Sequence, residues 1–163
     1  MDWQPWLRFA HIMGGFTFVL AHGVSVFVTL KLRAERDPAR VSTLLDLSRS
    51  SVVITASAVV FLLLTGIAAG FAGNYWGRLW IWASLVILVL LFAYMGFRGT
   101  RYHDAVRHAV GSIGIYDHKM TEGPPPDPAA LAELLDSPRA LELAAVGGIG
   151  LVALLFLMTL KPF

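Results

Sequence analysis

The sequence predicts an all-α protein, a membrane-embedded four-helix bundle in one domain over residues 1–163, with its N-terminus and C-terminus outside. Two observations carry this prediction. Of the 163 residues, 56% are hydrophobic and only 15% are charged, whereas a soluble domain carries about 25% charged residues. The apolar residues also gather in four long runs, each close to the roughly 20 residues that a helix needs to cross a bilayer.

The four predicted spans cover about residues 6–30, 51–71, 79–97 and 140–160. Backbone N–H and C=O groups find no partner in hydrocarbon, so each span must be helical. The short glycine-flanked stretch 73–77 predicts a tight turn between the second and third spans. A longer connection, residues 98–139, separates the third span from the fourth and is expected to be cytoplasmic.

Three Asp-Pro or Ser-Pro pairs mark helix starts outside the spans. Asp37 and Asp127 each place an N-cap side chain before a proline that opens a helix, and Ser137 repeats this pattern before Pro138. We therefore expect a helix that begins at Pro38 and runs into the second span. A short amphipathic helix over residues 128–135 is expected at the inner membrane surface.

The basic residues predict the direction of the spans. Most of them fall in the first and third connections: Lys31, Arg33, Arg36, Arg40, Arg49, Arg98, Arg101, Arg107, Lys119 and Arg139. By the positive-inside rule these connections face the cytoplasm, as in a multi-pass protein of the cell inner (plasma) membrane. Aromatic residues near the opposite ends of the spans favour the same topology: Trp3, Trp6, Tyr75, Trp76, Trp80 and Trp82.

Several function classes have no support in the sequence. The chain has no cysteine, which excludes disulfides, thiolate metal sites and thiol nucleophiles. A formal charge of +2 gives no reason to expect nucleic acid as a partner. No serine-histidine-acid set, phosphate loop or buried carboxylate pair is recognisable, so no self-contained catalytic site is expected. The expected partners are the lipid bilayer and either other membrane subunits or further copies in a homo-oligomer.

Small and polar residues at helical spacing predict the inward faces of the spans. The stripe on the first span is His11, Gly15, Phe18, His22, Ser25 and Thr29. The stripe on the second span is Ser51, Thr55, Ala58, Leu62, Thr65 and Ala69. The fourth span offers Ala144, Gly147, Gly148 and Gly150 for close approach.

Two histidines lie well inside the first span, and they are the candidate functional residues. His11 and His22 share one face and are separated by about 16 Å along the helix axis. An ionisable group inside a span is a functional hypothesis by default, and imidazole is a common axial ligand of haem iron. The pattern favours His11 and His22 as metal ligands that bind haem b, with Met95 and Met158 as candidate opposite ligands, in a membrane electron-transfer path.

Simpler explanations of the histidines stay open. Each imidazole in the first span can instead hydrogen-bond a hydroxyl across the bundle, such as Thr55 or Thr65. His103 and His108 are expected on a solvated face, because they follow the charged Arg98 and Arg101 on a cytoplasmic extension of the third helix. Their spacing of five residues does not place them on one helical face.

Short segments in the first hundred residues carry a family resemblance. They are WLRFAHIMGG at 6–15, KLRAERDP at 31–38, LTGI at 64–67 and WIW at 80–82. The chain resembles the CopD-like superfamily, and more closely a branch of predicted integral membrane proteins of unknown function. The resemblance implies a link either to copper uptake or to haem b. Copper import would need methionine or histidine relays, whereas the methionines here are scattered. A CopD-like metal permease therefore ranks behind haem binding and behind a non-catalytic accessory or assembly subunit of a larger membrane complex.

Overall fold

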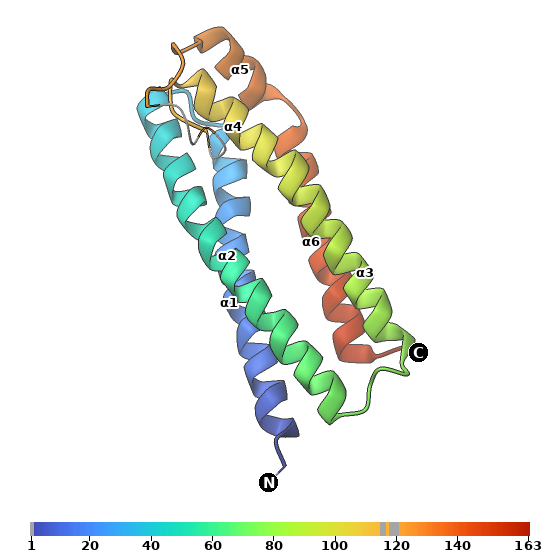
Figure 1. Ribbon diagram of the computed structural model, residues 1–163. Coiled ribbons are helices and arrows are strands. Elements are labelled where there is room, and N and C mark those ends of the chain that lie inside the picture. The colour runs from blue at the N-terminus through green and yellow to red at the C-terminus, as the bar shows by residue number, and fades with distance from the viewer. Residues whose placement is uncertain (1, 115–116, 118–120) are drawn as a thin grey trace.

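The computed structural model describes residues 2–114, 117 and 121–163, and every regular element in these ranges is a helix. Four long helical runs lie side by side (Figure 1): α1 (Gln4–Leu32), α2 (Pro38–Ala72), the continuous run of α3 (Leu79–Tyr94), η1 (Met95–Gly99) and α4 (Thr100–Ala109), and α6 (Arg139–Leu160). The short helix α5 (Pro128–Asp136) precedes α6. All four runs are long and apolar enough to cross a membrane. The predicted all-α four-helix bundle is confirmed.

The helix starts follow the predicted caps with one exception. Asp37 Oδ1 accepts a hydrogen bond from Ala39 N at 3.0 Å, and α2 runs unbroken from Pro38 into the second span. Asp127 caps α5 in the same way. The prediction that Ser137 caps α6 is wrong, because its hydroxyl donates to Leu134 O at 2.7 Å and so closes α5 instead.

The bundle has two distinct ends. Both termini and the turn between α2 and α3 lie at one end, which we call the terminal end (Figure 1). The start of α2, the end of α4, and α5 lie at the other, which we call the α5 end. His118 and Lys119, which the sequence places in the connection between α4 and α5, lie outside the described residues.

The main hydrophobic core lies at the α5 end. It joins α1, α2, α4, α5 and α6 through these buried side chains: Val28, Leu32, Val41, Leu45, Tyr102, Val106, Ala109, Leu131, Leu135, Ala140 and Leu143. The apolar face of α5 therefore packs on protein through Leu131 and Leu135, and the expected place of this helix at the inner membrane surface stays a prediction.

Away from the α5 end, the bundle separates into two helix pairs. α1 packs closely along α2 and α3 packs on α6, but α2 and α3 barely approach each other. A Cβ atom on Gly14 would lie 2.9 Å from the Phe61 side chain, so this glycine brings α1 against α2. The predicted stripe named Gly15 at this turn, yet nothing lies within 4 Å of its Cβ position. The close approach lies one residue earlier than predicted.

The core at the α5 end predicts where truncation is most destabilising. Leu135 is fully buried, and we expect Leu135→Ala to lower the free energy of unfolding in detergent by about 2–5 kcal/mol. Leu155 on α6 is 54% exposed on the apolar outer surface. Leu155→Ala should therefore have a much smaller effect. Equal losses of stability for the two variants would contradict this placement of the core.

Candidate functional site

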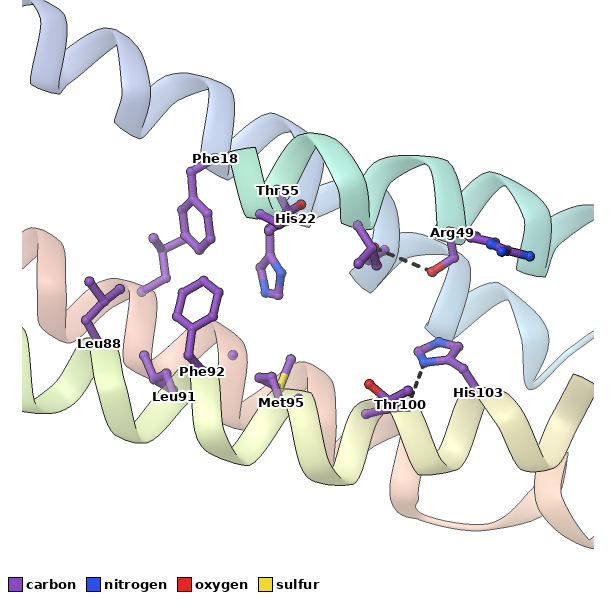
Figure 2. Close-up of a pocket in the computed structure, with 18 of the residues that line it drawn as sticks. Phe18, His22, Arg49, Thr55, Leu88, Leu91, Phe92, Met95, Thr100 and His103 are labelled. Atoms are coloured by element: carbon purple, nitrogen blue, oxygen red, sulfur yellow. Dashed lines mark hydrogen bonds between the residues drawn. The ribbon is translucent and has the colours of Figure 1, made fainter. Parts of the chain in front are cut away.

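A cavity of about 290 Å³ lies between the two helix pairs, towards the α5 end. Ligand pockets have volumes of about 300–1,000 Å³, so this cavity is at the small end of that range. Its walls are mostly apolar, and it is partly open to the outside. All four long runs contribute to its lining, which includes Phe18, His22, Ser25, Leu45, Ser48, Arg49, Val52, Thr55, Leu91, Met95, Gly99, Thr100, His103, Arg107 and Gly147. Figure 2 shows Phe18 and Leu88 towards one end of this space and Arg49 and His103 towards the other.

A turn of π-helix forms part of the cavity wall. This turn is η1, from Met95 to Gly99, inserted between α3 and α4. In a π-helix each N–H bonds five residues back, and such turns often occur at functional sites. Met95, Gly96 and Gly99 all line the cavity. The two glycines leave the wall without side chains, which widens the space at this depth.

His22 borders the cavity without a hydrogen-bond partner among the described residues. Its ring stacks on Phe18, with the ring centroids 5.5 Å apart and the planes 5° from parallel. Its Nε2 lies 3.0 Å from the point that a Cβ on Gly147 would occupy, and Met95 Cε lies 3.3 Å from the same point. The missing side chain of Gly147 therefore gives room to both groups. Of the four candidate ligands, the structure brings His22 and Met95 together (Figure 2).

His11 has a different environment. Its Nδ1 lies 3.0 Å from Leu62 O and 3.3 Å from Thr65 Oγ1, so Nδ1 is the protonated nitrogen that donates to the carbonyl. Its ring packs against Gly66 on α2. Hydrogen bonding across the bundle, the alternative that named Thr65, is therefore what the structure shows for His11. Neither His11 nor Met158, which is 39% exposed, lines the cavity between the helix pairs.

His103 is a cavity residue that the sequence analysis missed. Its Nδ1 donates to Gly99 O at 2.9 Å, and its Nε2 lies 3.2 Å from Thr29 Oγ1. The expectation of a solvated face is therefore wrong for His103. The available signal was the recurrence of cavity residues every four positions: Met95, Gly99, His103 and Arg107. The charges of Arg98 and Arg101 concealed this periodicity. His108 lies away from the cavity and pairs with Asp117.

The imidazoles of His22 and His103 are too far apart to share one metal ion. Thr29, which contacts His103, follows His22 by seven residues, or about 10 Å along α1. A metal ion lies only about 2 Å from each imidazole nitrogen that binds it. In addition, no three His, Asp or Glu side chains of the described ranges are grouped so that they could hold a metal ion.

Arg107 closes the cavity at the α5 end. Only 3% of this residue is exposed, and its guanidinium donates to Asp46 Oδ1 at 3.0 Å and to Leu45 O at 2.7 Å. These bonds join α4 to α2, and the carboxylate of Asp46 compensates the charge of Arg107. A charge-assisted hydrogen bond of this kind stabilises more than a neutral one.

Comparison of the chain with protein-family models, with curated proteins and with solved structures finds no match.

The two histidines of α1 should differ in their contribution to stability. His11→Ala removes one hydrogen bond to the Leu62 carbonyl, which keeps its bond from Thr65, and we expect it to lower the free energy of unfolding by about 0.5–1.5 kcal/mol. His22→Ala removes a ring that has no hydrogen bond to the described residues, so its cost should be smaller. Denaturant titration of both variants in detergent measures the difference. A larger loss for His22→Ala would contradict the assignment.

Proposed function

We propose that this protein binds haem b in the cavity between its helix pairs, where His22 and Met95 would hold the iron, and that it acts in a membrane electron-transfer path. One observation carries the proposal: an imidazole that has no hydrogen-bond partner in the described part of the chain borders an apolar cavity beside a thioether. Imidazole and methionine sulfur are both axial ligands of haem iron in cytochromes. Bound haem would supply one-electron redox chemistry.

The size and lining of the cavity support this ligand. On α2 the lining extends from Leu45 to Ala56, which is about 16 Å of helix. The cavity volume is small for a macrocycle, but the open side lets one edge of a flat ligand extend towards lipid. Phe18 stacks on the His22 ring and limits its rotation. The proposal has one site rather than two, since His11 and Met158 lie outside this cavity.

The chemistry of the His22 ring gives a reason to expect a ligand. His22 lines the cavity, and neither of its ring nitrogens has a hydrogen-bond partner among the described residues. In the neutral ring, one nitrogen is a donor and the other has a free lone pair. Coordination to iron would give that lone pair a partner, and the ring is placed for this where Nε2 lies against α6 at Gly147, beside Met95.

The proposed orientation places the α5 end in the cytoplasm and both termini outside, in the cell inner membrane. Its support is the concentration of arginines at the α5 end, such as Arg33, Arg36 and Arg40. A relationship to the CopD-like superfamily stays a prediction. So does association with other membrane subunits, in which the chain would serve as an accessory subunit, or with further copies of itself.

The first test is an absorption spectrum. We expect protein that is purified with haem supplied to show a Soret band that changes on reduction by dithionite. His22→Ala should remove most of this band, because the axial nitrogen is lost.

His11→Ala is the matched control, since it removes an imidazole of the same helix from outside the cavity. It should keep the band even if the protein is less stable. A colourless wild-type protein, or an unchanged spectrum in His22→Ala, would refute the proposal.

Single-cysteine labelling tests the orientation, and the chain suits it because it has no native cysteine. Gly77 lies in the exposed turn between α2 and α3 with open space at its Cβ position, and Glu133 is exposed on α5. A membrane-impermeant thiol reagent should label Gly77→Cys in intact cells, and Glu133→Cys only after the cells are broken. The reverse pattern would overturn the topology.

A further inference from the structure

Two arginines line the α5 end of the cavity, and they differ in their partners. Arg107 is buried and bonded to Asp46 and Leu45. Arg49 on α2 lines the same cavity but makes no hydrogen bond or ion pair with another described residue. The cavity is otherwise mostly apolar. Arg49 is exposed, so its guanidinium is an accessible positive charge at the edge of the cavity that no described residue pairs with.

Arg49 and His22 lie about 7 Å apart along the bundle axis and extend in opposite directions. Ser25 on α1 hydrogen-bonds Ser51 at 2.6 Å, which places the turn of α2 that carries Arg49 beside the turn that follows His22. Side chains of a helix tilt towards its N-terminus. The N-terminus of α2 lies at the α5 end and that of α1 at the terminal end (Figure 1). Arg49 is thus directed towards the α5 end, and His22 away from it.

We infer that Arg49 binds the carboxylate groups of the ligand, so that the cavity selects a flat apolar ring system that carries acidic groups at one edge. This inference rests on the proposed porphyrin ligand and adds its orientation, with the carboxylates towards the α5 end. A guanidinium matches a carboxylate with two parallel N–H···O bonds, and such charge-assisted bonds are about twice as strong as neutral ones. A ring without acidic groups would form no such bond with Arg49.

A lipid phosphate is the competing anion. Arg49 lies just before the apolar part of α2, where arginines commonly meet the phosphates of the bilayer. A phosphate would give Arg49 the same kind of bond, but the bound lipid would not need to occupy the cavity. Porphyrins with free and with masked carboxylates distinguish the two sources.

Metal-free protoporphyrin IX and its dimethyl ester are the probes, because they share one ring and differ only in the two carboxylates. Neither probe contains iron, so their binding does not depend on coordination by His22. We expect apoprotein in detergent to bind the diacid about tenfold more tightly than the diester, a difference of about 1.4 kcal/mol. Fluorescence anisotropy of the porphyrin measures both dissociation constants.

Arg49→Gln should weaken the diacid about tenfold and leave the diester unchanged. Arg40→Gln is the matched control, because Arg40 lies on the same helix, is exposed and pairs with Asp37 outside the cavity. It should alter neither dissociation constant. His22→Ala should keep the preference for the diacid, although it loses the iron-dependent spectrum.

Each remaining outcome contradicts one of the two proposals. Equal affinities of the wild-type protein for diacid and diester, or equal weakening of both by Arg49→Gln, would overturn the role of Arg49. So would a change in the co-purified anionic lipid of Arg49→Gln with no change in porphyrin preference. A preference for the diacid with no His22-dependent Soret band would refute axial ligation and leave the carboxylate site standing. Failure of both metal-free porphyrins to bind would overturn the carboxylate site, and the Soret band of protein purified with haem would then decide the proposed function separately.

Discussion

The separation between the two helix pairs is the constraint on which the candidate site depends. Helices in a bilayer gain little from hydrophobic association with each other, because lipid tails are as apolar as leucine. α2 and α3 have no extensive contact that would close the gap. The core at the α5 end does join the pairs, since it draws on α5 and on the ends of α1, α2, α4 and α6. The bundle is thus closed at one end and leaves a cavity nearer its middle.

Within each pair, the contacts are close and partly polar. α1 and α2 meet at Gly14, through the bond of His11 to Leu62 O, and through Ser25 and Ser51. Glu142 of α6 accepts hydrogen bonds from Tyr94 and from Arg98, which join the α3 run to α6. Each pair therefore forms a firm unit. His22 projects from one unit and Met95 from the other, so a ligand bound to both would also hold the pairs together.

The sequence predicted the elements well and the site only in part. Composition and apolar runs were enough for four spans, and the caps at Asp37 and Asp127 followed from local chemistry that needs no distant partner. His11 and His22 could not be told apart in this way. They lie on one stripe of one helix, and what separates them is the Leu62 carbonyl. A backbone acceptor on another helix has no signature in the side-chain sequence.

The cavity wall made by α3, η1 and α4 was hidden for a related reason. Hydropathy ends the third span at about residue 97, where Arg98 begins the charged stretch. The helix continues to Ala109, as the expected extension of the third span, but it presents His103 and Arg107 to the interior rather than to solvent. In addition, a π-turn changes the angular position of every later residue relative to a regular helix. A pattern that assumes 3.6 residues per turn therefore no longer identifies, beyond η1, the residues that face the interior.

The lining of the cavity narrows the class of ligand more than its volume does. A simple lipid would satisfy the apolar walls and Arg49 but would leave the lone pair of His22 without a partner. A neutral ring compound could accept from an imidazole N–H but would offer no anionic group to Arg49, which lies exposed at the edge of the cavity. A ring with a metal at its centre and carboxylates at its edge meets both demands, because His22 and Arg49 extend in opposite directions from neighbouring turns. The joint requirement, rather than either residue by itself, favours a metalloporphyrin.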